Sequence, residues 1–401
     1  MGRSGAHCGE WPGLYHSRQP ALSGRLRPFG RGQTLGLALA KGASAGRGVA
    51  GFPSCCALLS RAPLAYPVGH AQSMKHAPAG GAVVSAKHPI VAITGSAGAG
   101  TTTVRHAFTD IFRRQGINAA LVKGDAFFRF EKPEMDRFIA ESTAAGKPVS
   151  LFGPECNLFD KLEELFATYS RSGTGMIRHY VRDEDDARRF GQPVGTFTPW
   201  EPLPKGTDLL FYEGMHGGVA AHTWTRRRAS PAHLPTGMPD RRGKGGNGVN
   251  AAQYVDLLIG IVPAVNLEWI QKIHRDCSKA GCTVEEVTAT ILRRMRDYVH
   301  FIVPQFGITD INIQRMPLVD TSNPFIARDV PTADESILVI HFRDPHLFDF
   351  PDLLRRITGS FMSRPNTMVV PGGKLRLALE VICSPLIEEL IAGRKRPRRR
   401  T

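Results

Sequence analysis

Residues 95–103 read GSAGAGTTT and directly follow the apolar run 89–93, PIVAI. The run is typical of a buried strand, and residues 104–108, VRHAF, are typical of a helix, so the glycines lie in the turn between them. Glycines let the backbone N–H groups of such a turn point toward one place, and the start of the helix adds partial positive charge. The stretch therefore predicts a cradle for the phosphates of ATP, and an ordinary glycine turn is the alternative.

One position of this loop departs from the common pattern G-x-x-x-x-G-K-[ST]. Gly95 and Gly100 have the right spacing and Thr102 supplies the metal-coordinating hydroxyl, but Thr101 stands where the lysine is usual. A lysine or arginine from elsewhere must then reach the transferred phosphate. The residues expected to bind the nucleotide are Gly95, Ser96, Ala97, Gly98, Ala99, Gly100, Thr101, Thr102 and Thr103.

Composition indicates a globular protein, with 42% apolar and 22% charged residues and no apolar run long enough to span a membrane. The net charge of +15 is concentrated at the ends, with +8 in residues 1–84 and +6 in residues 393–401. The body is therefore close to neutral, and we expect no nucleic-acid partner. Seven cysteines without metal-site spacing predict reduced thiols and a cytoplasmic location.

The chain divides into four parts by pattern. Residues 1–84 are nearly free of acids, so a transit peptide, a disordered extension and a mis-called start compete. We favour the mis-called start, because folded-type sequence begins abruptly at residue 85. One kinase domain is expected over 85–392, with a surface insertion or lid at 221–250, and a basic disordered tail over 393–401.

Apolar runs and helical patterns alternate from residue 87 onward, which predicts an α/β fold with a mixed, mostly parallel sheet flanked by helices. Ligands in such sheets bind at the carboxyl ends of the strands. Strands are expected at 89–94, 118–123, 208–213, 256–262, 299–303, 311–319 and 337–342. Helices are expected at 101–115, 133–145, 157–170, 265–280, 283–297, 351–360 and 373–392.

Phosphoryl transfer also needs a carboxylate to take the proton of the acceptor, a metal ion against the phosphates, and cations for the transferred group. Residues 122–127, VKGDAF, place Asp125 after a strand, and we expect it to be the general base; capping of the next helix is the alternative. Residues 209–214, LLFYEG, place Glu213 where an acid would hold Mg²⁺ or its water; capping of a turn is the alternative.

The missing loop lysine is expected from residues 269–276, WIQKIHRD. Lys272, Arg275 and Asp276 share one helix face through their i,i+3 and i,i+4 spacing. We expect Lys272 to be catalytic, Asp276 to be catalytic and a metal ligand, and Arg275 to bind a sugar phosphate with its planar fork. Arg293 and Arg294 are further candidates for the substrate, with a solvent-exposed face as the alternative.

Several ordered segments together resemble the phosphoribulokinases of the proteobacterial type. They are the loop GSAGAGTTTV, GDAFFRF at 124–130, FYEGMHGG at 211–218, NLEWIQKIHRD at 266–276, VPQFGITDINIQR at 303–315 and VDTSNPFIAR at 319–328. The resemblance runs from about Lys87 to Glu389. The family signature K-[LIVM]-x-R-D-x-x-x-R-G-x-[ST]-x-E is matched at Lys272, Arg275, Asp276, Gly281, Thr283 and Glu285.

The resemblance implies transfer of phosphate from ATP to D-ribulose 5-phosphate in the Calvin–Benson cycle, giving ribulose 1,5-bisphosphate. It also implies a fold similar to nucleoside monophosphate kinases, a homo-octamer, activation by NADH and inhibition by AMP. The catalytic base of the family falls on Asp125 and its metal-associated acid on Glu213. The loop lysine is absent from the family as well, and neither nucleic acid nor membrane is an implied partner.

Four positions depart from the family pattern. Phe128 replaces a histidine, Lys132 replaces an arginine, and Ala280 replaces the second arginine of the signature. All three are associated with the sugar phosphate, so its binding should weaken unless Lys132 and Lys279 compensate. His341 stands in place of an arginine tied to the effector response, whose partner is retained at Arg364.

Two other functions remain open at this point. One is a related kinase that acts on another acceptor such as uridine. The other is a nucleotide-binding regulatory protein without turnover. The intact acids and cations favour an active enzyme, whereas Phe128 and Ala280 are the features that favour either alternative.

Overall fold

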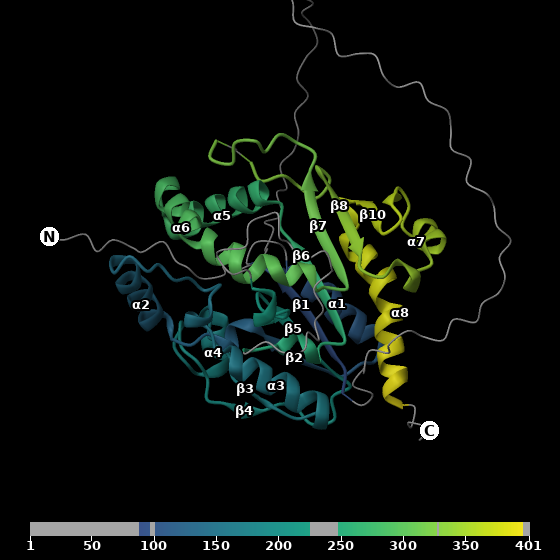
Figure 1. The fold of residues 1–401 in the computed structure, drawn as a ribbon, viewed down its shortest axis with the longest axis horizontal. Coiled ribbons are helices and arrows are strands. Elements are labelled where there is room, and N and C mark those ends of the chain that lie inside the picture. Colours follow the sequence, from purple (N-terminus) through teal and green to yellow (C-terminus); the bar gives the residue numbers. More distant parts are fainter. Residues whose placement is uncertain (1–87, 97–100, 225–247, 327–328, 396–401) are drawn as a thin grey trace, which may run out of the picture. The chain divides into compact units, whose positions relative to one another are not determined.

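The computed structural model describes residues 88–96, 101–224, 248–326 and 329–395, which belong to one compact unit (Figure 1). Its main feature is an eight-stranded sheet, in which the strands follow the order β2-β5-β1-β6-β7-β8-β10-β9. These strands are β1 (Ile90–Gly95), β2 (Ala119–Lys123), β5 (Leu209–Gly214), β6 (Leu257–Val262), β7 (Ile311–Pro317), β8 (Ser336–Phe342), β9 (Phe361–Arg364) and β10 (Thr367–Pro371). The first five in the order pair in parallel, and the remaining pairs are antiparallel. The predicted mixed, mostly parallel sheet is confirmed.

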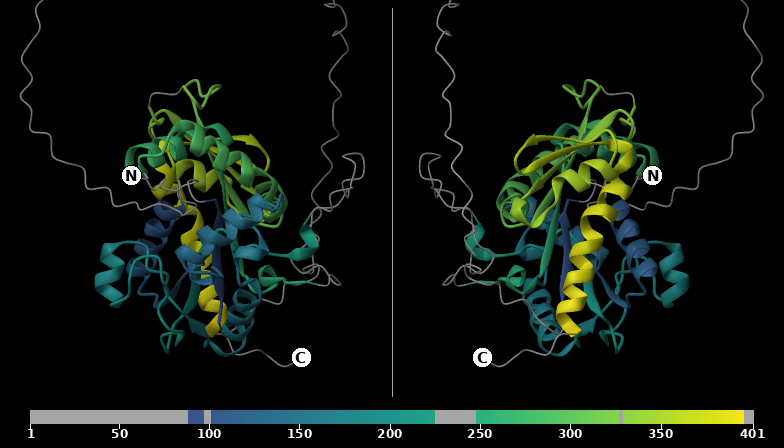
Figure 2. Two further views of the ribbon diagram at one scale, coloured as in Figure 1. Left: turned by 90° about the vertical axis from the view of Figure 1, so that its left-hand side faces the viewer. Right: turned by 90° about the vertical axis from the view of Figure 1, so that its right-hand side faces the viewer.

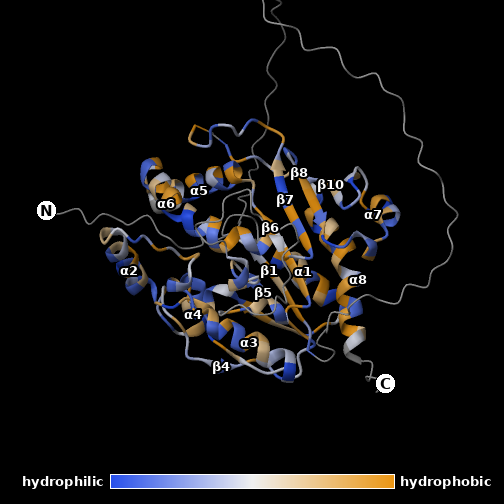
Figure 3. Cartoon of the chain, in the orientation of Figure 1, coloured by the Kyte–Doolittle hydropathy of each residue, from blue (hydrophilic) through white to orange (hydrophobic). Residues whose placement is uncertain are grey.

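Helices cover both faces of the sheet, and a second, two-stranded sheet is formed by β3 (Met176–Ile177) and β4 (Glu201–Pro202). The helices are α1 (Thr101–Gln115), α2 (Lys132–Ala144), α3 (Phe159–Ser172), α4 (Glu184–Phe190), α5 (Val265–Ala280), α6 (Val284–Asp297), α7 (Phe350–Arg356) and α8 (Leu375–Lys395). Cover on both faces explains why the central strands read as unbroken apolar runs rather than as alternating ones. Figure 3 shows this as apolar colouring along the central strands.

β1 lies at the centre and separates two cores. Val91 and Ile93 face a cluster that includes residues of α1 and α8, whereas Ile90 and Ala92 face a cluster that includes residues of α3. All four side chains have no exposed area. The carboxyl end of β1, from which the predicted phosphate loop departs, is therefore fixed by packing on both sides.

The helix α8 runs alongside α1, as the yellow and dark-blue ribbons of Figure 2 show. Arg114 of α1 donates to both carboxylate oxygens of Glu380 at 2.5 and 2.8 Å, and Arg376 of α8 pairs with Asp110. A bidentate arginine–carboxylate pair fixes orientation better than a point contact. The helix that begins at the phosphate loop is thereby tied to the carboxyl-terminal helix.

The sequence prediction was wrong at several elements. Residues 299–303 were expected to form a strand, but they continue α6 as a π-helical turn (Tyr298–Ile302) and a 3₁₀ turn (Val303–Gly307). Their alternation of apolar residues is typical of a strand, yet Val299 is 52% exposed and lies on the outer side of a helix. The hairpin of β9 and β10, the short strands β3 and β4, and α4 were not predicted, and α7 ends at residue 356 rather than 360.

The predicted insertion at 221–250 has adjacent ends. Ala220 and Asn250 form an antiparallel bridge, and the Ala221 N–H donates to the Val249 carbonyl at 2.8 Å. Residues 225–247 lie outside the described ranges, as does the predicted extension 1–84. The predicted tail begins inside a helix, because α8 extends to Lys395.

Two further expectations from the sequence concern the state of the cysteines and membrane-spanning helices. Cys156, Cys277 and Cys383 are free thiols, as expected. Within the described ranges, no helix combines the length and the apolar character that a bilayer crossing requires.

Candidate active site

The predicted phosphate loop begins at the buried end of β1 and leads into α1. Ser96 is fully buried, and its hydroxyl donates to the Glu268 carboxylate of α5. Residues 97–100 and the side chains of Thr101 and Thr102 lie outside the described part of the chain. β1 ends at Gly95 and α1 begins at Thr101, so a strand and a helix lie on either side of the predicted loop, as a phosphate cradle requires.

The two candidate acids lie at the ends of adjacent parallel strands. In the register of β2 and β5, Lys123 is opposite Glu213, so Asp125 and Glu213 leave the sheet at the same edge. Gly124 and Gly214 make this possible, because a Cβ added to Gly214 would lie 2.8 Å from the Gly124 Cα. Only glycine allows so close an approach, and the structure thus brings the predicted base and the predicted metal acid together.

Each of these acids lies beside an arginine. Asp125 is buried, with 2% of its side chain exposed, and Oδ2 accepts from the Nε–H of Arg182. Glu213 has 11% of its side chain exposed, and its Oε2 lies 3.6 Å from Nε of Arg105 in α1. Although burial opposes it, the charges of Asp125 and Glu213 raise the pKa of Arg182, which remains a cation.

A second charged group lies on α5, on the face that the sequence predicted. Asp276 accepts from Lys272 Nζ at 2.5 Å and from Arg275 Nε at 2.8 Å, and all three side chains are between 10 and 13% exposed. Burial, aided by the charge of Arg294, lowers the pKa of Lys272 to about 8. Although burial opposes it, Lys272 and Arg275 hold the pKa of Asp276 below its usual range. Both Asp276 oxygens are thus bonded to cations.

Glu268 connects this charged group to the phosphate loop, and the sequence analysis missed it. Its carboxylate accepts from Ser96, and Arg294, Lys272 and Arg275 act on it electrostatically. Burial raises the pKa of Glu268, while Ser96 and the three cations oppose that shift. One signal was available, since Glu268 lies four residues before Lys272 and so on the same helix face.

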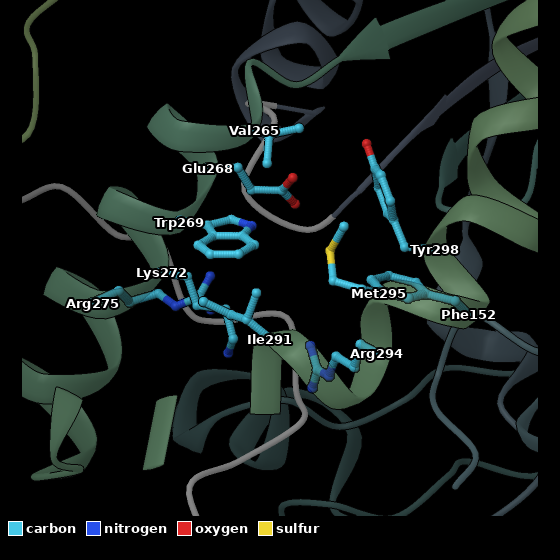
Figure 4. Close-up of a pocket in the computed structure, with 10 residues that line it drawn as sticks. All are labelled: Phe152, Val265, Glu268, Trp269, Lys272, Arg275, Ile291, Arg294, Met295 and Tyr298. Carbon is cyan, nitrogen blue, oxygen red and sulfur yellow. The ribbon is translucent and has the colours of Figure 1, made fainter. Parts of the chain in front are cut away.

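Two cavities adjoin Glu268. The first, here the α5–α6 pocket, has a cavity volume of about 50 Å³. Figure 4 shows Glu268 and Lys272 from α5 and Arg294 from α6 around it. Its lining consists of Phe152, Val265, Glu268, Trp269, Lys272, Arg275, Ile291, Arg294, Met295 and Tyr298. It is therefore a pocket with cations on an otherwise largely apolar and aromatic wall.

The second cavity, here the α1–α5 cleft, has a volume of about 300 Å³ and begins at the first turn of α1. Its lining includes residues of β6 and β7, the glycines 372 and 373, and Thr103, Val104, Leu267, Glu268, Gln271, Leu338 and Arg376. Because Glu268 lines both cavities, it forms part of the wall between them.

The other residues that the sequence predicted to bind the substrate form contacts within the protein or lie outside the described part. Lys132 Nζ donates to Asp136 at 2.6 Å with 40% of the lysine side chain exposed. Arg293 donates to the Val149 carbonyl at 3.3 Å, and the side chain of Lys279 is outside the described part. Phe128 is 1% exposed and packs into an apolar core, so it presents no group to a ligand.

The two positions that the resemblance ties to an effector response, His341 and Arg364, lie on strands β8 and β9, which flank β10. In the strand registers Thr367 is opposite His341 on one side and opposite Arg364 on the other. The His341 ring Nε2 is hydrogen-bonded to the Asn366 amide at 3.0 Å. His216, within the segment FYEGMHGG, is a different case, because burial lowers its pKa to about 4 and leaves it neutral.

A phosphate loop on a mostly parallel sheet, two acids at neighbouring strand ends and a basic helix beside the loop define a P-loop kinase. Residues 90–227 and 238–322 match the phosphoribulokinase / uridine kinase family, and the chain belongs to this family.

Similar proteins point within the family to phosphoribulokinases. The chain is 50% identical over 314 residues to the chromosomal phosphoribulokinase of Cupriavidus necator, covering 78% of this chain and 99% of that protein. It is 51% identical over 311 residues to the phosphoribulokinase of Nitrobacter vulgaris, covering 77% and 99%. The solved phosphoribulokinase from Rhodobacter spheroides superposes with a TM-score of 0.66 at 46% identity, covering 78% of this chain and all of that chain.

Proposed function

We propose that this chain transfers the γ-phosphoryl group of ATP to a hydroxyl of D-ribulose 5-phosphate, giving ribulose 1,5-bisphosphate and ADP for the Calvin–Benson cycle. The observation that carries the proposal is the shared sheet edge at which Asp125 and Glu213 lie, next to the strand that enters the phosphate loop. We assign the base and the metal acid to one side of the transferred phosphoryl group. Lys272 is assigned to the other side, on the helix whose Glu268 accepts from Ser96 of the loop.

Asp125 is assigned as the general base. The acceptor O–H bond breaks and its proton passes to the carboxylate, while the oxygen lone pair forms the new bond to γ-phosphorus. The bond from γ-phosphorus to the β–γ bridging oxygen breaks, and its electron pair leaves with ADP. Lys272 is assigned to the charge on the transferred phosphoryl group, which the usual loop lysine would otherwise stabilise.

Glu213 fits a Mg²⁺ role, with the hydroxyl of Thr102 as the second predicted ligand. Mg²⁺ at nucleotide sites takes one or two carboxylates and fills its shell with phosphates and water, so a single acid at this edge is sufficient. Among the described residues, no group of three or more His, Cys, Asp and Glu side chains could hold a metal ion by itself, so the phosphates and water must complete the shell. Bound Mg²⁺ would neutralise charge on the phosphates. Asp276, whose two oxygens already bond cations, is better suited to orienting Lys272 and Arg275 than to holding metal.

The two cavities are assigned to the two substrates. The α1–α5 cleft begins at Thr103, where the phosphate loop ends, and we assign it to the base and ribose of ATP. The α5–α6 pocket holds Arg275 and Arg294, and we assign it to the sugar phosphate, because a planar guanidinium binds phosphate through two parallel bonds. Lys132, Lys279 and Arg293 remain predicted auxiliary ligands.

An acceptor panel tests the function. Purified protein with ATP and Mg²⁺ is assayed for ADP release with ribulose 5-phosphate, ribose 5-phosphate and uridine, and the product is identified by ³¹P NMR. We expect turnover with ribulose 5-phosphate alone. Uridine phosphorylation would support the other branch of the family, and ATP binding without turnover on any acceptor would support a regulatory protein.

We also propose a cytoplasmic homo-oligomer, by resemblance an octamer, that responds to NADH and AMP. The support for an effector response is the placement of His341 and Arg364 on either side of Thr367. Light scattering of the purified protein measures the oligomer size. Rates at subsaturating ATP with and without each nucleotide measure the response, which we expect to be weakened by His341.

A further inference from the structure

Two arginines from one irregular segment hold the loop that carries Asp125. Residues 178–182 read RHYVR and lie more than 50 positions after the loop in the sequence. Arg182 pairs with the Asp125 carboxylate. Arg178 donates from Nε to the Ala126 carbonyl at 2.9 Å and from Nη2 to the Phe128 carbonyl at 2.6 Å.

The backbone of this segment is itself fixed. Val181 donates to the Thr196 carbonyl at 2.9 Å and accepts from the Gly195 N–H at 2.7 Å, and Thr198 donates to the His179 carbonyl at 2.9 Å. Segments 179–181 and 195–198 therefore form an irregular two-stranded ladder. Both arginines project from a backbone that has little freedom to move.

Aromatic rings fix the direction of Arg178. Its guanidinium carbon lies 3.5 Å from the centroid of the Phe197 ring and 4.9 Å from that of Trp200. Such stacking holds a guanidinium in one plane. Both carbonyls that it binds follow Asp125 in the chain, so Arg178 holds the backbone directly after the residue that carries the carboxylate.

Arg182 is the cation that pairs with the buried Asp125. Only 2% of the Asp125 side chain and 26% of the Arg182 side chain are exposed. A guanidinium holds its N–H donors in one rigid plane, so the pair fixes the orientation of the carboxylate.

We propose that Arg182 is the positioning residue of the general base, turning Asp125 so that Oδ1 accepts the proton of the acceptor hydroxyl. The inference rests on the proposed role of Asp125. The ion pair uses Oδ2, and the second oxygen of a carboxylate accepts independently. Arg178 holds the backbone that follows Asp125, so both the carboxylate and the chain that carries it are fixed.

The test is the measurement of kcat and KM for both substrates in Arg182→Gln. Loss of the guanidinium should lower kcat by about 10–10²-fold, because a base misplaced by about 1 Å acts poorly, while KM for ATP stays unchanged. The matched control is Arg188→Gln, which breaks an ion pair with Asp185 on the exposed helix α4 and should leave kcat unchanged.

Two results would overturn the proposal. The first is an unchanged kcat in folded Arg182→Gln. The second is a loss that appears only in KM for ribulose 5-phosphate, which would make Arg182 a substrate ligand instead. If Arg182→Gln does not fold, Arg182→Lys decides: a smaller loss of kcat with unchanged KM supports the proposal, and a wild-type kcat refutes it. Asp125→Asn runs in parallel, and if it remains active the base assignment itself fails.

Discussion

Lys272 offers the sharpest test of the site, because this single cation on α5 is proposed to replace the usual lysine of the phosphate loop. Lys272→Met keeps most of the apolar stem and removes the charge. Loss of one preorganised donor to the transferred phosphoryl group typically lowers kcat by about 10²–10³-fold. Since the ammonium group acts on the transition state, we expect the loss in kcat rather than in KM for ATP.

The effect on stability should be small by comparison. Breaking a buried ion pair costs about 3–5 kcal/mol when one charge is left alone, but Asp276 keeps its bond to Arg275 at 2.8 Å. Burial of the ammonium is itself unfavourable, as the lowered pKa of Lys272 shows, and methionine removes that cost. We therefore expect a change below about 2 kcal/mol, or a few degrees in Tm.

The assay is steady-state ADP release with kcat and KM measured for both substrates, alongside thermal unfolding. Because the active form is the cation, wild-type kcat/KM should fall as the pH rises through about 8, the pKa of Lys272. Lys272→Arg keeps the charge at high pH and should lose that alkaline limb. Lys161→Met, which removes an exposed pair with Glu164, is the control. A folded Lys272→Met enzyme with kcat within tenfold of wild type would refute the assignment, and an unfolded one would indicate a structural role.

Three further changes test other parts of the site. Asp125→Asn should lower kcat by about 10²–10⁴-fold with unchanged ATP affinity by calorimetry, and near-normal kcat would remove the base assignment. Glu268→Gln keeps an acceptor for Ser96 but removes a buried negative charge near the phosphates, so the Kd for ATP should fall; weaker binding would contradict this electrostatic account. Gly214→Ala places a Cβ 2.8 Å from the Gly124 Cα, so Tm and kcat should both drop, with about 1–3 kcal/mol lost; an unchanged Tm would contradict the close approach.

The sheet was predictable because its central strands are buried on both faces. The run 90–93, for example, has no exposed area in any side chain, and such runs are visible without knowledge of the topology. The hairpin 361–371 was missed because β9 is short and mostly exposed, so its residues carry little apolar signal. The prediction of a strand at 299–303 was wrong because the same pattern also fits a helix whose outer side is apolar.

The site was predictable in its acids and its basic helix but not in its partners. Asp125 and Glu213 follow apolar runs, and the α5 residues have helical spacing, so local pattern was sufficient. Arg182 lies 57 residues after Asp125, and Glu268 lies 172 residues after Ser96. Contacts over such separations depend on how the segments fold together, and the charged stretch around Arg182 resembles any solvated loop.

The charges of the site are arranged so that substrates must compete with internal partners. Asp125 and Glu213 each lie beside an arginine on one side of the loop, while Lys272 and Arg275 share Asp276 on the other. Asp276 already neutralises Lys272, so a phosphate that binds Lys272 must compete with this carboxylate. The free energy gained is therefore the difference between the Lys272–phosphate and Lys272–Asp276 interactions. Such an exchange favours the group that fits the cation best, and in a kinase that group is the phosphoryl in transfer, whose charge develops where the cations are fixed. With Lys272 in its proposed role, these ion pairs reduce the gain from binding the ground state, so the rate acceleration comes from the charge that develops only in the transition state.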